Sequence, residues 1–223
     1  MSGDKIIKSL SILFCLSLFL PLSLSSGERS TENIDIEKFR AHTIVNRLLN
    51  ENLKKLNLIE VISRNFGYSD YVKLKKDYWT ARVLVSKKEI IQAQKLLEKN
   101  NAEMNESLKI ISMDYQEAAQ KMIDESIDKI NEFEFIGIVN NLDNRRKLNM
   151  LRDKIKFASQ LFDNANKGIA YQRYSSSITL FRSVKSYAIS ILKDLCEPGE
   201  ENQIMDRFKI HIVDNRNEVY NKG

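Results

Sequence analysis

The fold is decided by residues 88–135, KEIIQAQKLLEKNNAEMNESLKIISMDYQEAAQKMIDESIDKINEFEF, a stretch with no proline and no glycine. Its apolar residues recur at steps of three and four, and from Met104 to Met122 they form a heptad seam. An unbroken helix over this stretch is about 70 Å long at 1.5 Å per residue. We expect a kink at Asn100–Asn101, where two polar residues interrupt the apolar pattern.

The same scarcity of helix breakers extends over most of the chain. Between Gly27 and Pro198 there is no proline, and the only glycines are Gly67, Gly137 and Gly168. Proline breaks a helix and glycine weakens one, so the sequence predicts an all-α fold with helices that end near these glycines. We expect Gly67 to supply a left-handed residue after the first long helix, and Gly168 to mark a turn.

The apolar periodicity predicts five long helices and one short helix. The second is expected to be capped by Ser69 or Asp70, and the fourth by Asp143 or Asn144. The predicted ranges are 34–64, 70–86, 88–135, 143–167 and 174–195, followed by a short helix at 200–208.

The end of the chain has a different pattern. Phe208, Ile210 and Ile212 alternate with polar residues, and this period of two predicts an extended segment that ends in a polar turn at 214–217. The expected architecture is an elongated all-α bundle of long antiparallel helices with helical hairpins and a short extended C-terminal segment.

Small residues are placed similarly around two of the predicted turns. Ala81 and Ala93 flank one turn, and Ala165 and Ser177 flank another at the same spacing. Small side chains let antiparallel helices approach closely, as in tetratricopeptide repeats. The sequence therefore predicts two helical hairpins with similar packing.

Residues 1–26 have the pattern of a secretory signal peptide, with Lys5 and Lys8 before an apolar run and small residues at Ser25 and Ser26. A membrane anchor is the alternative, because the run is about long enough to span a bilayer. Cleavage leaves residues 27–223 as a single elongated helical domain in the periplasm. Cys196 is then the one remaining cysteine, so we expect a buried thiol and no internal disulfide.

Charge and motifs argue against several classes of function. Asp4, Lys5 and Lys8 of the predicted signal peptide carry a net +1, so its removal from the formal +5 leaves +4. This charge is spread along the helices rather than concentrated in a basic face, which disfavours nucleic-acid binding. No zinc-binding, calcium-binding, phosphate-loop or serine-hydrolase motif is present. The sequence predicts a protein that is not an enzyme and has no cofactor, no metal site and no small-molecule substrate.

Three groups of ionisable residues need an interpretation of their own. Asp124 and Asp128 are one helical turn apart, but Lys121 and Lys129 lie beside them, so a solvated helix face is the preferred interpretation. His42 is expected at the surface or boundary of the first helix. His211 is expected beside the extended C-terminal segment.

Aromatic side chains gather at two of the predicted turns. Core packing at helix crossings is the preferred interpretation. The alternative is a partner surface, because tyrosine and tryptophan are enriched at the centres of protein interfaces. The candidate interface residues are Phe66, Tyr68, Tyr71, Trp79 and Tyr171.

Four stretches of the chain stand out together: NFGYSDY at 65–71, ITLFR at 178–182, ISILKDL at 189–195 and HIVDNRN at 211–217. Together they resemble the flagellar coiling proteins of spirochaetes, and the smaller, second member of that family is closer in length. The resemblance implies an exported, all-helical, non-enzymatic protein of the sheath around the periplasmic flagellar filament. Its implied partners are the flagellin core and other sheath proteins, without nucleic acid and without stable membrane insertion. A periplasmic helical-repeat-like adaptor that binds a peptide or helix is the alternative.

Overall fold

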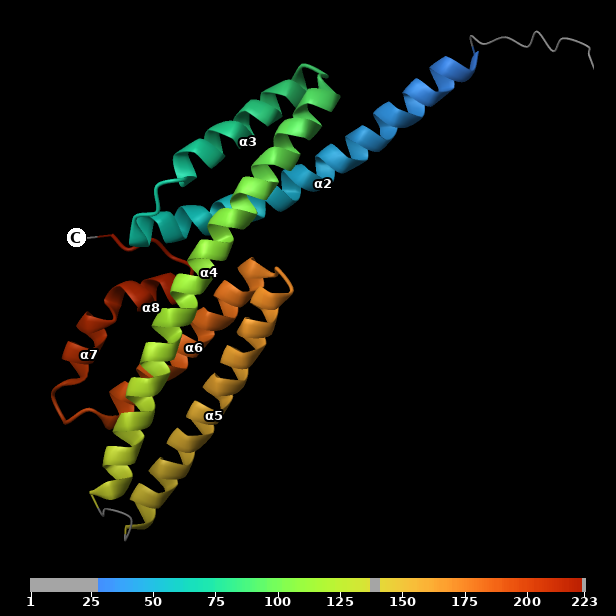
Figure 1. Ribbon diagram of the computed structural model, residues 1–223. Coiled ribbons are helices and arrows are strands. Elements are labelled where there is room, and N and C mark those ends of the chain that lie inside the picture. Colours follow the sequence, from blue (N-terminus) through green and yellow to red (C-terminus); the bar gives the residue numbers. More distant parts are fainter. Residues whose placement is uncertain (1–27, 137–140, 222–223) are drawn as a thin grey trace, which may run out of the picture. The chain divides into compact units, whose positions relative to one another are not determined.

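A computed structural model describes residues 28–136 and 141–221, with side chains from residue 39 onward (Figure 1). The chain divides into two units, residues 1–40 and residues 41–223. In the first unit, residues 28–40 form the beginning of helix α2. The predicted signal peptide and Gly137 lie outside the described residues. Among the described residues, no helix combines the length and the apolar character needed to cross a bilayer.

The described residues contain seven α-helices and no strand, so the predicted all-α fold is confirmed. Each of the five long helices predicted from the apolar periodicity is present. The helices are α2 (Glu28–Phe66), α3 (Tyr71–Ser86), α4 (Ile90–Phe135), α5 (Leu142–Ala170), α6 (Tyr174–Leu195), α7 (Glu201–Arg207) and α8 (Lys209–Asn215).

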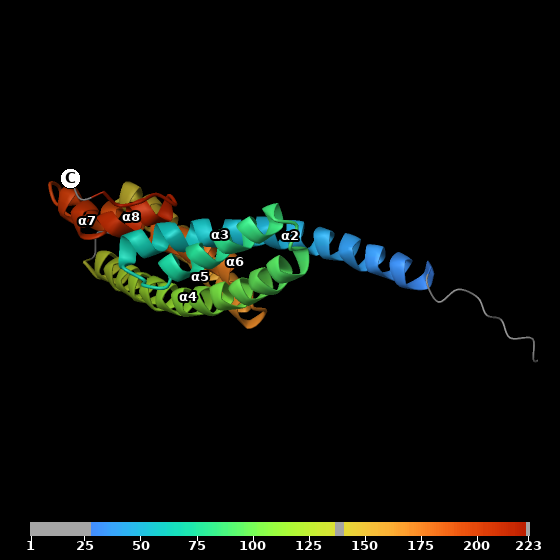
Figure 2. The same cartoon turned by 90° about the horizontal axis from the view of Figure 1, so that it is seen from above.

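Helix α4 is the scaffold of the second unit, because the other long helices pack along it (Figures 1 and 2). Helix α3 pairs with its N-terminal half, while α5 and α6 lie against the half that follows. The α-helix continues through Asn100 and Asn101. The buried Asn100 side chain donates a hydrogen bond to the carbonyl oxygen of Leu74 at 2.9 Å, and Asn52 of α2 donates one to Leu97 at 3.0 Å. These amides hold α2, α3 and α4 together.

The first predicted turn is confirmed, and the cap of α5 is shifted. Gly67 follows the last residue of α2 with a φ of 80°, a conformation that glycine adopts without steric cost. The N-cap of α5 is Asn141 rather than the predicted Asp143 or Asn144. Its side-chain oxygen accepts a hydrogen bond from the backbone N–H of Asp143 at 3.0 Å, so the asparagine satisfies a free donor at the helix start.

The prediction that Gly168 marks a turn is wrong, because Gly168 lies inside α5. Its missing side chain is required by the neighbouring helix, since a Cβ atom there would lie 2.3 Å from Oγ of Ser177. The Ser177 hydroxyl donates to the carbonyl oxygen of Ala165 at 2.8 Å. The glycine therefore permits the close approach of α5 and α6.

The expectation of two similarly packed hairpins agrees with the burial of all four small residues, Ala81, Ala93, Ala165 and Ser177, which are 0% exposed. In the second hairpin, Phe162 and Phe181 meet edge to face with their centroids 5.5 Å apart. Cys196, in contrast, is half-buried rather than buried. It caps α6, and its thiol donates to the carbonyl oxygen of Lys193 at 3.1 Å.

The prediction of an extended C-terminal segment is wrong, because residues 209–215 form helix α8. Phe208 and Ile212 are four residues apart and therefore lie on one helical face, where they pack with Met122, Ile189 and Leu192. The alternation of apolar and polar residues fits both a strand and a short helix, and this apolar surface favours the helix. The predicted polar turn is also wrong at Asp214, which is helical and fully buried.

Candidate functional site

The five predicted interface residues do not converge on one surface. Phe66 is half-buried and packs edge to face on Tyr115, with ring centroids 6.0 Å apart. Tyr68 is half-buried, and its hydroxyl donates to the Asp114 carboxylate. Burial and this hydrogen bond raise the pKa of Tyr68 well above its usual range. Phe66 and Tyr68 thus anchor the α2–α3 turn on α4.

Helix α3 carries two of the other candidates. Tyr71 is half-buried at its start, with the Lys75 ammonium 5.2 Å from the ring centroid. Trp79 is 48% exposed and lies edge to face with Tyr78, and the Arg82 guanidinium stacks 4.7 Å from its ring. Tyr78, rather than Trp79, faces the core.

Trp79 belongs to an exposed apolar face of α3 together with Val72 and Val83, which are 73% and 50% exposed. These residues are seven and four positions apart, a spacing that places them on one side of the helix. Tyr171 stands apart in the α5–α6 turn and is 72% exposed. The structure therefore presents Trp79 and Tyr171 to solvent and turns Phe66 and Tyr68 inward.

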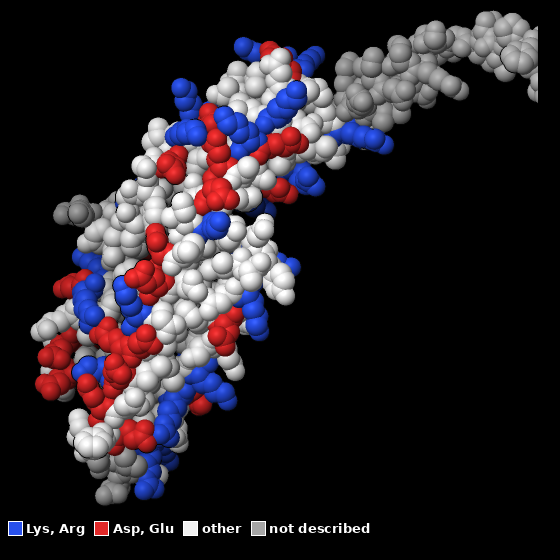
Figure 3. Space-filling model, viewed as in Figure 1, with Lys and Arg blue, Asp and Glu red and all other residues white. Residues whose placement is uncertain are grey.

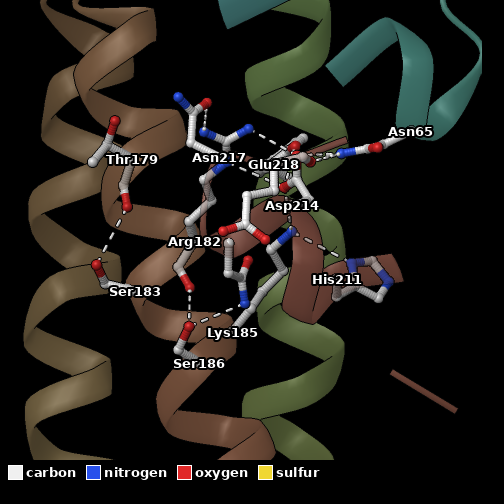
Figure 4. Close-up of polar contacts among 12 residues, drawn as sticks. Asn65, Thr179, Arg182, Ser183, Lys185, Ser186, His211, Asp214, Asn217 and Glu218 are labelled. Carbon is white, nitrogen blue, oxygen red and sulfur yellow. Dashed lines mark hydrogen bonds and ion pairs between the residues drawn. The ribbon is translucent and has the colours of Figure 1, made fainter. Parts of the chain in front are cut away.

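A cluster of buried charged side chains, which the sequence reasoning did not predict, lies where α4, α6 and α8 meet (Figure 4). Its centre is Asp214 of α8, whose side chain is fully buried. The Arg182 guanidinium donates to both carboxylate oxygens of Asp214, from Nη2 at 2.7 Å and from Nε at 3.1 Å. The Tyr115 hydroxyl donates to the same carboxylate at 2.5 Å. Asn65 of α2 also donates to this carboxylate, at 3.4 Å, so Asp214 accepts hydrogen bonds from three long helices.

Lys185 is the most deeply buried cation of this ionic cluster. Its ammonium is 3.6 Å from the Asp214 carboxylate, 4.0 Å from the centroid of the Tyr115 ring and 3.4 Å from Nδ1 of His211. Burial lowers the pKa of Lys185 from 10.5 to about 8, and the attraction of Asp214 only partly opposes this effect. The aromatic face and the carboxylate compensate for the lost hydration of the ammonium.

The other ionisable groups respond to the same environment. Burial, and then the charge of Lys185, lower the pKa of His211 from 6.5 to about 4, so the imidazole is neutral at neutral pH. A neutral ring can accept a hydrogen bond from the Lys185 ammonium at Nδ1. Burial alone would raise the pKa of Asp214, but the hydrogen bonds and charge of Arg182, together with the Tyr115 hydroxyl and the charge of Lys185, lower it. The buried carboxylate is therefore ionised.

Asn65 and Asn217 extend the ionic cluster along the end of the chain. The Asn65 amide donates to the carbonyl oxygen of Glu218 at 2.8 Å and accepts from the backbone N–H of Tyr220 at 2.6 Å. Arg182 also donates to the side-chain oxygen of Asn217 at 2.9 Å. The C-terminal segment, residues 208–220, is thereby fastened to the end of α2 as well as to α4 and α6.

This arrangement fastens α8 to α4 and α6. The charged groups face one another, and each hydrogen bond of Asp214 comes from within the chain. Among the described residues, no group of three or more histidine, cysteine, aspartate or glutamate side chains is placed to hold a metal ion. His42 is exposed, as expected, whereas His211 faces Lys185 rather than flanking an extended segment.

One signal in the sequence pointed to the ionic cluster. Lys185 lies on the apolar stripe of α6, between Phe181 and Ala188 at steps of four and three. A cation on a stripe that faces the core requires a buried anion as partner. Which anion it meets follows only from the tertiary contacts.

Comparisons of the chain with protein families, with characterised proteins and with solved structures found no match. Fold and site together define a helical protein in which the described buried charges serve internal contacts.

Proposed function

We propose that this protein is a non-enzymatic structural component of the periplasmic flagellar filament sheath, where it promotes filament coiling and motility. The observation that carries the proposal is α4, a helix of 46 residues on which α3, α5 and α6 pack. At 1.5 Å per residue this helix is about 69 Å long. Neighbouring helices packed along its side restrict its bending, which suits a subunit that works through its shape.

The mechanism of this proposal is geometric. The exported chain, cleaved near Ser25 or Ser26, coats one side of the filament and contacts flagellin or other sheath proteins. Repeated lateral contacts on one side then bias the curvature of the filament. Each contact can be weak, because multivalency along a polymer multiplies modest affinities. The resemblance of residues 65–71 and 211–217 to flagellar coiling proteins supports this choice of assembly.

The ionic cluster also supports a structural role. It fastens the C-terminal segment to three long helices through Asp214, Arg182 and Asn65. A subunit that transmits shape must resist fraying at its ends. The contacts of Asp214, Arg182 and Asn65 oppose fraying of the C-terminal segment, because they pair its buried charge with groups on the long helices.

Two experiments test the proposal. Mass spectrometry of purified periplasmic filaments is expected to find the mature chain as a stoichiometric component. A deletion strain is expected to have filaments with reduced coiling, and the intact gene in trans should restore them. Normal coiled filaments in the deletion strain, or filaments without the chain, would refute the proposal.

A periplasmic adaptor is the second candidate, and the exposed α3 face of Val72, Trp79 and Val83 favours it. Trp79 is the only tryptophan of the chain, so its fluorescence reports directly on this face. An adaptor is expected to form a one-to-one complex that shifts the emission of Trp79. The change Val72→Asp should weaken that complex, while Val72→Ala should have a smaller effect.

A further inference from the structure

Charge is distributed unevenly around the part of the second unit formed by α4, α5 and α6. Residues 124–135 of α4 carry five acidic side chains and one lysine. Helix α5 carries seven lysine or arginine side chains and three aspartates. In the lower part of Figure 3, acidic side chains gather over α4 and α7, and basic ones over the edge formed by α5. The two helices therefore present surfaces of opposite sign.

The acidic surface includes an exposed apolar residue. Asp124, Ile127 and Asp128 occupy one face of α4, since they are three and four residues apart. All three are exposed, and Ile127 is 38% exposed. Among the described ion pairs, none involves Asp128. We call these three residues the acidic stripe.

The basic surface contains a matching hollow. A shallow groove between α5 and α6 is lined by Arg146, Met150, Lys154, Phe157 and Tyr187. Met150 and Phe157 are 45% and 47% exposed, and Phe157 packs edge to face on Tyr187 with centroids 5.3 Å apart. We call this hollow the aromatic groove.

The cations around the aromatic groove are only partly neutralised within the chain. Arg146 is 3.8 Å from Asp143, a long contact between exposed groups. Lys154 lines the groove and is paired with Asp194 at 2.5 Å. Lys156 is not a lining residue; it lies on α5 one turn from Asp153, which does line the groove, and takes part in no ion pair among the described residues. An apolar side chain flanked by two carboxylates would pack on the ring of Phe157, while the carboxylates would face Arg146 and Lys156.

One such pairing already exists inside the chain. Glu134 of α4 receives two hydrogen bonds from the Arg152 guanidinium of α5, each 2.7 Å long. The acidic stripe lies further toward the N-terminus of α4, where the described ion pairs include no α5 cation for Asp124 or Asp128. The same chemistry is thus available to a second chain.

We propose that this protein associates with further copies of itself through a heterologous contact, in which the acidic stripe of one copy covers the aromatic groove of the next. Ile127 enters the groove at Phe157, and Asp128 faces Lys156. Because the two surfaces differ and lie on different helices, each copy offers one of each. Such a contact either closes a ring or continues as an open chain. This inference goes beyond the sheath proposal and does not depend on it.

Disulfide cross-linking of the purified protein tests the contact. Two single-cysteine chains are made in a background with Cys15→Ser and Cys196→Ser, one carrying Ile127→Cys and the other Phe157→Cys. Both positions are exposed, so the fold is expected to be retained. In a mixture of the two chains, the mixed dimer should exceed each homodimer at least fivefold. Random yields, no cross-link, or a dominant Ile127→Cys homodimer would overturn the proposal.

Charge exchange then tests the pairing. Adding Asp128→Lys to the first chain, or Lys156→Glu to the second, should lower the mixed yield at least fivefold, and both changes together should restore it. The matched control is Lys95→Glu, at an exposed position of α4 outside the stripe, which should leave the yield unchanged. Salt at 1 M, where the Debye length is about 3 Å, should also reduce the yield. If the mixed yield is unchanged by Asp128→Lys alone, by Lys156→Glu alone and by 1 M salt, the charge pairing is refuted.

Discussion

The replacement Asp214→Asn gives the strongest test of the ionic cluster. Asparagine has nearly the same shape as aspartate, but it removes the buried negative charge between Arg182 and Lys185. The side chains of these two cations are only 6% and 1% exposed. Breaking a buried ion pair by neutralising one partner typically costs about 3–5 kcal/mol, because the other charge is left uncompensated. We expect a loss of about 3 kcal/mol in the free energy of unfolding.

Urea unfolding followed by circular dichroism at neutral pH measures this loss. The matched control is Asp206→Asn on α7, an exposed carboxylate that takes part in no ion pair among the described residues, and it should change stability by less than about 0.5 kcal/mol. Hydrogen exchange provides a local measurement, because residues 208–220 should lose protection before α4 does. A cost below about 1 kcal/mol, or unchanged protection of this segment, would refute the fastening role of Asp214.

The remaining predictions concern the same buried groups and the α5–α6 contact. Lys185→Met should be at least as stable as the parent at neutral pH, because burial of the ammonium lowers its pKa to about 8 and opposes folding. The unfolded chain holds this proton up to about pH 10.5, so the parent should gain about 3 kcal/mol as pH rises above 8, and urea titrations of the variant should lack that gain. The pKa of His211 is lowered to about 4, so the unfolded chain binds a proton more readily than the folded chain between pH 6.5 and 4. The parent should therefore lose about 2 kcal/mol of stability over this range after solvent screening, and His211→Gln should lose less. Gly168→Ala should cost about 1–2 kcal/mol in thermal unfolding because its Cβ would meet Ser177, and adding Ser177→Ala should recover most of the loss; equal stability of the single and double variants would contradict the packing argument.

The helices themselves were accessible from local sequence. The stretch predicted as a helix at 88–135 is helical from Ile90 to Phe135, and the break at Gly67 lies where expected. Glycine and proline act on the backbone of their own segment, and an apolar stripe is a property of one helix. The small residues Ala81 and Ala165 indicated close helix packing because a small side chain lets a neighbouring helix approach, and both are fully buried.

The candidate interface was only partly accessible. Aromatic residues at a turn suit both a core and a partner surface, and the local pattern does not separate the two. The structure turns Tyr68 toward Asp114 and leaves Trp79 on the outer face of α3. Whether an aromatic side chain is buried or exposed depends on which face of its helix or turn packs against another helix.

The sequence by itself determined an all-α chain built from long amphipathic helices, because periodicity and the absence of helix breakers act within each segment. The tertiary structure alone decided the burial of Asp214 with Arg182 and Lys185, and the helical form of residues 209–215. A helix of seven residues is marginal without neighbours, and a buried charge is tolerated only where a distant part of the chain supplies its partner.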